Sequence, residues 1–160
     1  MNWNAIDVLL IEDNPDDAEL TIRELKKHHL ANNLFHVQDG EEALDFIFAS
    51  GKYADTRNIL KPPKVVLMDI QMPKVNGIEV LRRMKSDERT RFTPVVILTS
   101  SNQDPDIHTC YGLGANSYIV KPVDFDRFSK VIRDLGFYWL ILNQPDTDEE
   151  NGLKRGRVAE

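Results

Sequence analysis

The feature that most limits the fold of this chain is a repeated alternation between short apolar runs and helical segments. Buried strands are predicted for the runs at 6–11, 34–37, 65–68, 95–98 and 118–120. Between them, apolar residues recur at helical spacing, as in the series Ala18, Ile22 and Leu25. Apolar strands that alternate with helices are typical of a parallel sheet covered by helices on both faces. The sequence therefore predicts a doubly wound α/β fold with five parallel strands.

Turn and capping residues separate these elements. Asn14 can cap the first helix with Pro15 at its first position, and Asp39-Gly40 precedes the second helix. A long polar connection covers residues 50–63. The last helix is predicted to begin near Asp124 and to carry one apolar face, made of Phe128, Val131, Ile132, Leu135, Trp139 and Leu142.

Length and composition indicate one soluble domain. The chain has 160 residues and a mass of 18.4 kDa, which suits a single domain, expected at 5–143 with a flexible polar tail at 144–160. The formal net charge of -6 argues against a nucleic-acid surface. Cys110 is the only cysteine, so no intrachain disulfide can form. Because no apolar run is long enough to span a membrane, we expect a cytoplasmic protein.

Polar residues stand at the carboxyl ends of four predicted strands. The first strand is followed by Glu12 and Asp13, the third by Asp69, the fourth by Thr99 and the fifth by Lys121. In an open parallel sheet these ends meet at the crevice where the strand order reverses, and ligands bind there. We therefore expect three carboxylates, one hydroxyl and one ammonium group to converge on one site.

This set of side chains suits a metal ion and a phosphoryl group. Converging carboxylates repel one another, and a divalent cation offsets that repulsion. Mg²⁺ prefers oxygen ligands and usually combines one or two protein carboxylates with phosphate oxygens, which fits Glu12, Asp13 and Asp69. Lys121 and Thr99 can donate to phosphoryl oxygens. Since aspartate is known to form acyl phosphates, Asp69 is the candidate nucleophile.

The motifs around these residues resemble the receiver domain of two-component response regulators. They are IEDN, VVLMDIQMP followed by NG, VVILTSS, and SYIVKP, in that order. Thirty residues separate Asp69 from Thr99, and twenty-two more lead to Lys121, with Tyr118 three residues before it. The resemblance covers about residues 7–142 and implies a flavodoxin-like sheet with the strand order 2-1-3-4-5.

The resemblance implies a phosphoacceptor and a set of metal ligands. Asp69 would take a phosphoryl group from a phosphohistidine of a sensor histidine kinase. Asp13, Asp69 and the backbone carbonyl of Gln71 would hold Mg²⁺, with Glu12 acting mainly through a bound water. On this basis the protein is a signalling phosphoacceptor, with autophosphorylation and autodephosphorylation as its only chemistry, and not a metabolic enzyme.

The resemblance also implies a switch. Lys121 and Thr99 would bind phosphoryl oxygens, and the movement of Thr99 would let Tyr118 turn inward, which changes the surface of the fourth helix, fifth strand and fifth helix. Pro122 would follow a cis peptide bond. The residues after 142 are too few for a DNA-binding module, so output is expected through protein contacts. The ending GFYWLILNQP is most similar to stand-alone regulators of cyanobacterial-type phytochrome kinases.

Three other functions remain open from the sequence. An aspartyl-phosphate phosphohydrolase would need a second acid two residues after its nucleophile, where this chain has Gln71. A flavodoxin-like cofactor binder would need a phosphate-friendly loop after the first strand, where this chain has EDNPDD. A degenerate receiver that switches by contacts alone would not need all five residues of the site.

Acidic residues at the start of the first helix and apolar residues at the end of the last one can each have an ordinary structural explanation. Asp16 and Asp17 are interpreted as first-turn acids that interact favourably with the helix dipole. Phe137 and Ile141 fall opposite the apolar face of the last helix, and Gly136 weakens that helix. Either the helix ends early there, or Phe137 and Ile141 form a patch that pairs with a second copy; we favour a homodimer.

Overall fold

The computed structural model describes residues 2–30 and 32–144. Five parallel strands form one sheet in the order β2-β1-β3-β4-β5, as the sequence predicted. The strands are β1 (Val8–Ile11), β2 (Leu34–Val37), β3 (Val65–Met68), β4 (Val95–Thr99) and β5 (Ser117–Val120). The α-helices are α1 (Pro15–Lys27), α2 (Gly40–Phe48), α3 (Gly77–Ser86), α4 (Asp104–Leu113) and α5 (Phe125–Phe137).

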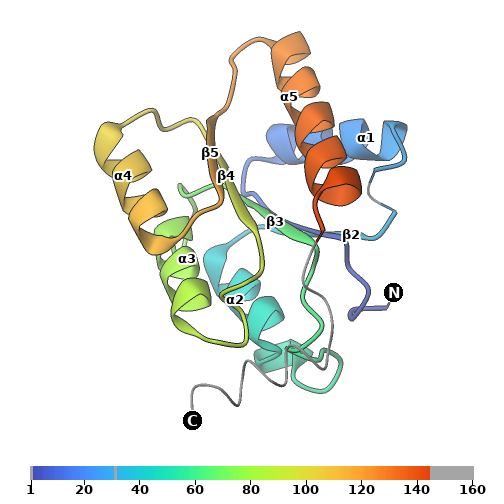
Figure 1. Cartoon of the computed structure of the whole chain (residues 1–160), viewed down its shortest axis with the longest axis vertical. Coiled ribbons are helices and arrows are strands. Elements are labelled where there is room, and N and C mark those ends of the chain that lie inside the picture. The colour runs from blue at the N-terminus through green and yellow to red at the C-terminus, as the bar shows by residue number, and fades with distance from the viewer. Residues whose placement is uncertain (1, 31, 145–160) are drawn as a thin grey trace.

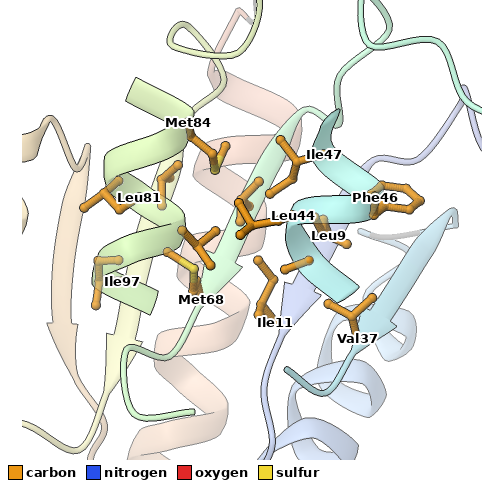
Figure 2. Close-up of a cluster of buried hydrophobic side chains, with 14 of the residues drawn as sticks. Leu9, Ile11, Val37, Leu44, Phe46, Ile47, Met68, Leu81, Met84 and Ile97 are labelled. Atoms are coloured by element: carbon orange, nitrogen blue, oxygen red, sulfur yellow. The ribbon is translucent and has the colours of Figure 1, made fainter. Parts of the chain in front are cut away.

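The helices cover both faces of the sheet, which gives two apolar cores (Figure 1). Alternate strand residues point to opposite faces, so Leu9 and Ile11 join the core under α2, α3 and α4, whereas Val8 and Leu10 join the core under α1 and α5. Figure 2 shows part of the first core, where side chains of the strands and of α2 and α3 point toward one another. Because β1, β3 and β4 are buried along their whole length, they fix the sheet rigidly beneath the strand ends.

The first turn of α1 confirms the predicted Asn14 cap, and two other helices are capped by aspartates. The side chain of Asn14 accepts hydrogen bonds from the backbone N–H groups of Asp16 and Asp17, with Pro15 in the first turn of α1. Asp39 caps α2 and Asp124 caps α5 in the same way. These caps place the start of each helix directly after a strand end, which brings the helix N-termini toward the site.

The polar connection after α2 folds back on the N-terminal segment. It contains a short 3₁₀ helix (Gly51–Tyr53), and its Arg57 is only 6% exposed. The Arg57 guanidinium donates to the backbone carbonyls of Phe46 at 2.7 Å, Trp3 at 2.9 Å and Lys61 at 3.3 Å. Arg57 therefore ties the end of α2, the N-terminus and the connection together.

The last helix does not end early at Gly136. The α-helix continues to Phe137 and passes into a π-helical turn, Tyr138–Leu142. A Cβ on Gly136 would lie 2.5 Å from Leu25 Cδ2, so the glycine permits close packing of α5 on α1. The prediction that Leu142 lies on the core face is wrong, since its side chain is 57% exposed. The wider π turn changes the helical spacing, so Trp139 stays buried while Leu142 rotates outward.

Three other expectations concern the peptide bond before Pro122, a membrane span and the C-terminal tail. The peptide bond before Pro122 is trans, because the described residues contain no cis peptide, so the expected cis bond is wrong. The trans form is the one that X-Pro bonds ordinarily prefer. No helix within residues 2–30 and 32–144 has the length and apolar character of a membrane span. The tail predicted at 144–160 lies, apart from Gln144, outside the described residues.

Candidate functional site

The side chains predicted to converge at the carboxyl ends of the strands do meet there. Lys121, directly after β5, extends its ammonium group to Asp69 Oδ2 at 2.8 Å and to Glu12 Oε1 at 2.5 Å. Thr99, the last residue of β4, donates its hydroxyl to Asp69 Oδ1 at 2.6 Å. Both oxygens of the Asp69 carboxylate are therefore bound, one by a cation and one by a neutral donor.

The three acids form a cluster whose geometry suits a cation. Carboxylate oxygens of Glu12, Asp13 and Asp69 all lie within 4.8 Å of one another. Glu12 and Asp69 are buried and Asp13 is exposed, so a cation can reach the group from solvent. A set made only of carboxylate oxygens matches the hard ligands that Mg²⁺ and Mn²⁺ prefer.

Gln71 lies beside this cluster, two residues after Asp69. Its backbone N–H donates to Asp69 Oδ1 at 3.0 Å, while its side chain is exposed. The Asp69 Oδ1 atom thus accepts from both Gln71 and Thr99. These bonds fix the orientation of the carboxylate; the metal-binding role of the Gln71 carbonyl stays a prediction.

Gly77 shapes the loop on which Gln71 lies. A Cβ at this position would lie 2.5 Å from the Asp69 carbonyl oxygen and 2.7 Å from Ile70 Cα. The Gly77 N–H donates to the Ile70 carbonyl at 3.0 Å. A residue without a side chain is needed here because α3 closely approaches the backbone that follows β3.

Burial and charge act against each other within the cluster. Burial, with a smaller effect of the Asp69 charge, raises the pKa of the Glu12 carboxyl from 4.5 to about 7 although Lys121 opposes the rise. Burial alone would lower the pKa of Lys121, but hydrogen bonds to Asp69, Glu12 and Asp17 raise it above its usual value. Lys121 is therefore a permanent cation at neutral pH, whereas Glu12 exchanges a proton in the physiological range.

Asp17 is a residue of the site that sequence reasoning missed. It lies in the first turn of α1, as expected for a dipole partner, but its carboxylate also accepts from Lys121 Nζ at 2.9 Å. Asp16, in the same turn, is exposed. The available signal was the position of Asp17 three residues after the Asn14 cap, on a helix that begins at a strand end. A contact across 104 residues could not be read from periodicity.

The predicted switch residues are connected through the loop after β4. Tyr118 is half-buried, and its hydroxyl donates to the Ser101 carbonyl at 2.9 Å. The Ser101 hydroxyl donates to Asp106 in the first turn of α4 at 2.5 Å, and its backbone N–H donates weakly to Thr99 Oγ1 at 3.4 Å. Ser101 thus joins Thr99, Tyr118 and α4 in one path of hydrogen bonds, and the switch itself stays a prediction. Sequence reasoning gave Ser101 and Asp106 no part in this path.

The two predicted dimer residues lie far along the chain from the site, at the end of α5. Phe137 is 50% exposed and Ile141 is 55% exposed. Tyr138 and Leu142 beside them are also more than half exposed. The structure thus leaves an apolar surface at this end of the molecule.

Comparison with known proteins agrees with this geometry. Residues 8–133 match the family model described as "Response regulator receiver domain". The chain is 35% identical to the probable methanogenesis regulatory protein FilR2 of Methanothrix harundinacea, over 86% of this chain and 85% of that protein. The name of FilR2 refers to the regulation of methanogenesis and not to phytochrome.

Two solved structures have the same fold over most of their length. The phosphorylated cyanobacterial phytochrome response regulator RcpA is 30% identical, with a TM-score of 0.82 over 89% of this chain and 99% of that one. The Mn²⁺-bound form of response regulator Rcp1 from Synechocystis is 29% identical, with a TM-score of 0.80 over 86% of this chain and 96% of that one.

The parallel sheet, the acidic pocket at its carboxyl edge and the matched residues lead to the same conclusion. Receiver domains are typically non-enzymatic phosphoacceptors that work with histidine kinases, and phytochrome regulators are among the nearest structures. This chain belongs to the response regulator receiver family.

Proposed function

We propose that this protein is a single-domain response regulator whose Asp69 accepts a phosphoryl group from the phosphohistidine of a sensor histidine kinase. The observation that carries the proposal is the double hydrogen bonding of Asp69, whose two carboxylate oxygens are held by Lys121 and by Thr99 beside a further pair of acids. A buried carboxylate held this way is fixed in orientation, which favours in-line attack.

The chemistry needs little besides positioning and charge. A carboxylate oxygen of Asp69 attacks phosphorus, the bond from phosphorus to the imidazole nitrogen breaks, and that nitrogen keeps the electron pair. Mg²⁺, held by Glu12, Asp13, Asp69 and the Gln71 carbonyl, would neutralise charge on the phosphoryl oxygens when bound. Lys121 and Thr99 donate to the oxygens that gain charge in the transition state.

The surface next to the site supports a protein donor. A groove of about 320 Å³ runs between α1 and the segment after β5, and Asp17, Leu20, Pro122, Val123 and Phe125 are part of its lining. Val123 and Phe125 are strongly exposed although both are apolar. Exposed apolar side chains beside a reactive carboxylate suit a helical protein partner that must present a phosphohistidine. The RcpA relative supports a phytochrome-type kinase.

Output is proposed to pass through protein contacts in the cytoplasm. When the phosphoryl group binds Thr99, the path through Ser101 to Tyr118 and Asp106 changes the α4–β5–α5 surface. Independently of this change, the apolar residues at the end of α5 pair with a second copy. Four exposed apolar side chains gathered at one end of a helix suit a two-fold homodimer, in which the same surface of each copy pairs with its equivalent.

The test is phosphorylation by a small donor. Wild type, Asp69→Asn and the matched control Asp16→Asn are incubated with acetyl phosphate or beryllofluoride, with and without Mg²⁺, and the modified residue is mapped by mass spectrometry. We expect a metal-dependent adduct on Asp69 in wild type and Asp16→Asn, and none in Asp69→Asn. An adduct at another residue, or one formed equally well after chelation, would overturn the proposal.

The same preparation distinguishes the rivals. Repeated turnover of small phosphomonoesters would favour a phosphohydrolase, although the exposed Gln71 replaces the second acid that such an enzyme needs. A yellow protein that releases flavin on denaturation would favour a cofactor binder.

A further inference from the structure

Lys121 has three acidic partners in the structure, and one of them lies outside the metal cluster. Its three N–H donors point to Glu12 Oε1 at 2.5 Å, Asp69 Oδ2 at 2.8 Å and Asp17 Oδ2 at 2.9 Å. Glu12 and Asp69 belong to the group of carboxylates that can hold a cation, and Asp17 does not. Asp17 is thus the acid that Lys121 need not share with a metal ion.

A bound divalent cation changes the balance around Lys121. Such an ion would attract the Glu12 and Asp69 carboxylates and repel the ammonium group that shares them. The phosphoryl group then needs an N–H donor of the same lysine. From this geometry we infer that Asp17 is a positioning residue, which holds Lys121 at the phosphoacceptor while Mg²⁺ and the phosphoryl group occupy its other partners. The inference rests on the proposed transfer to Asp69.

The side chain of Asp17 is placed to do this. The Asn14 cap fixes the backbone of the first turn of α1 through bonds from Asp16 N–H and Asp17 N–H, at 3.0 Å and 3.1 Å. The side chain of Asp17 is 31% exposed and so stays partly hydrated, whereas that of Lys121 is only 5% exposed. A fixed, partly hydrated anion can orient a buried cation with little loss of side-chain entropy.

Two other roles for Asp17 predict different results. If it acts only through the helix dipole, Asp16 in the same turn should matter as much. If its charge mainly repels the anionic phosphodonor, its removal should speed the reaction and lower the half-saturating donor concentration. A positioning role predicts that removal slows the reaction at saturating donor, since the loss falls on the transition state.

The experiment compares Asp17→Asn with Asp16→Asn, which removes the same charge from the same helical turn. Phosphorylation by acetyl phosphate at saturating Mg²⁺ is followed by intact-protein mass spectrometry over a range of donor concentrations. We expect Asp17→Asn to lower the limiting rate constant about three- to tenfold and to leave the half-saturating donor concentration within about twofold. Asp16→Asn should stay within about twofold of wild type in both.

Two further variants test whether the effect passes through Lys121. Asp17→Glu restores the carboxylate one methylene further out and should recover at least about half of the lost rate. In a Lys121→Met background, Asp17→Asn should change the rate constant less than about twofold, because the residue it positions is gone. An equal drop in both backgrounds, or no rescue by Asp17→Glu, would overturn the inference.

The outcomes also separate this inference from the proposed function. If wild type is not modified on Asp69, the proposed function fails. If wild type is modified and the two asparagine variants react alike, or Asp17→Asn reacts faster, only the positioning role fails. If part of a variant is misfolded, the final extent of modification falls while the rate constant of the folded molecules stays unchanged. The final extent and the rate constant are therefore measured separately.

Discussion

Thr99 and Asp69 are thirty residues apart in the chain, and the hydroxyl of Thr99 donates to the Oδ1 atom of Asp69 at 2.6 Å. Thr99 is completely buried, so this hydroxyl has no access to bulk water. The bond holds the carboxylate in one orientation and places a donor where charge would develop during phosphoryl transfer.

Replacement of Thr99 by valine should therefore slow phosphorylation with little change in packing. Valine keeps the shape of the side chain and removes only the hydroxyl, and we expect the rate constant with acetyl phosphate to fall about three- to tenfold because Lys121 remains in place. Thr99→Ser keeps a donor and should stay within about twofold of wild type. The time course of phosphoprotein on a phosphate-affinity gel measures both. Equal rates for the two variants would contradict the role of the hydroxyl.

The raised pKa of Glu12 predicts how the free energy of unfolding depends on pH in the absence of divalent ions. Its pKa in the folded protein is about 7, above the usual value of 4.5, so the folded state binds this proton more tightly than the unfolded state. Its contribution to the free energy of unfolding is therefore complete below the unfolded pKa and is lost as the pH rises through about 7. The loss has an upper limit of about 3 kcal/mol.

Urea denaturation at pH values of about 5 and about 8 checks this prediction. The glutamine of Glu12→Gln cannot ionise. The free energy of unfolding of this variant should therefore increase, relative to that of wild type, as the pH rises. Asp16→Asn, which removes an exposed acid, should run parallel to wild type. If the free energy of unfolding of Glu12→Gln changes with pH as that of wild type does, burial does not raise the pKa of Glu12.

The sheet and five residues of the site could be predicted because they depend on local patterns. Apolar runs mark the strands, and the rule for parallel sheets places five strand-end residues at one edge without further information: Glu12, Asp13, Asp69, Thr99 and Lys121. The bounds of β2 and β3 agree with the predicted runs, since polar turns stop those strands sharply.

Other parts of the structure depend on contacts between distant segments, which periodicity does not record. Asp17 has the sequence position of an ordinary first-turn acid, and only the position of Lys121 across the crevice gives it a partner. The π-helical turn after Phe137 widens the helical spacing, so Leu142 lies at the surface. Arg57 appeared to lie in a polar loop and is instead buried among three backbone carbonyls.

Arg57 should be important for stability and unimportant for phosphoryl chemistry. Its guanidinium carbon lies 4.1 Å from the centre of the Phe46 ring, and burial lowers its pKa to about 10, so it remains charged at neutral pH. Arg57→Met would leave the carbonyls of Phe46, Trp3 and Lys61 without this donor. We expect the free energy of unfolding to fall by about 2–4 kcal/mol, as measured by urea denaturation.

A matched arginine shows whether this effect is specific. Arg23 pairs with Glu19 on the surface of α1, and the two side chains are each 66% exposed. Arg23→Met should change the free energy of unfolding by less than about 0.5 kcal/mol. If both variants lose the same stability, the buried carbonyl contacts of Arg57 contribute nothing beyond an exposed arginine.

Phe137 and Ile141 should control self-association. They lie one turn apart, both at least half exposed, and with Tyr138 and Leu142 they present four large apolar side chains without a charged residue among them. Two such surfaces related by two-fold symmetry would bury these side chains against their equivalents in the second copy. In sedimentation at tens of micromolar, wild type should be dimeric, and Phe137→Ser or Ile141→Ser should weaken the dimer about tenfold or more.

Phe92→Ser is the control, because Phe92 is 48% exposed and lies between α3 and β4, in a different part of the chain. It removes the same ring and should leave the dimer unchanged if association depends on the end of α5. Thermal unfolding of each variant separates lost association from lost folding, since Trp139 beneath this apolar surface stays buried and holds α5 to the core. A wild-type monomer at these concentrations, with Phe137→Ser indistinguishable from it, would rule out this surface as a dimer interface.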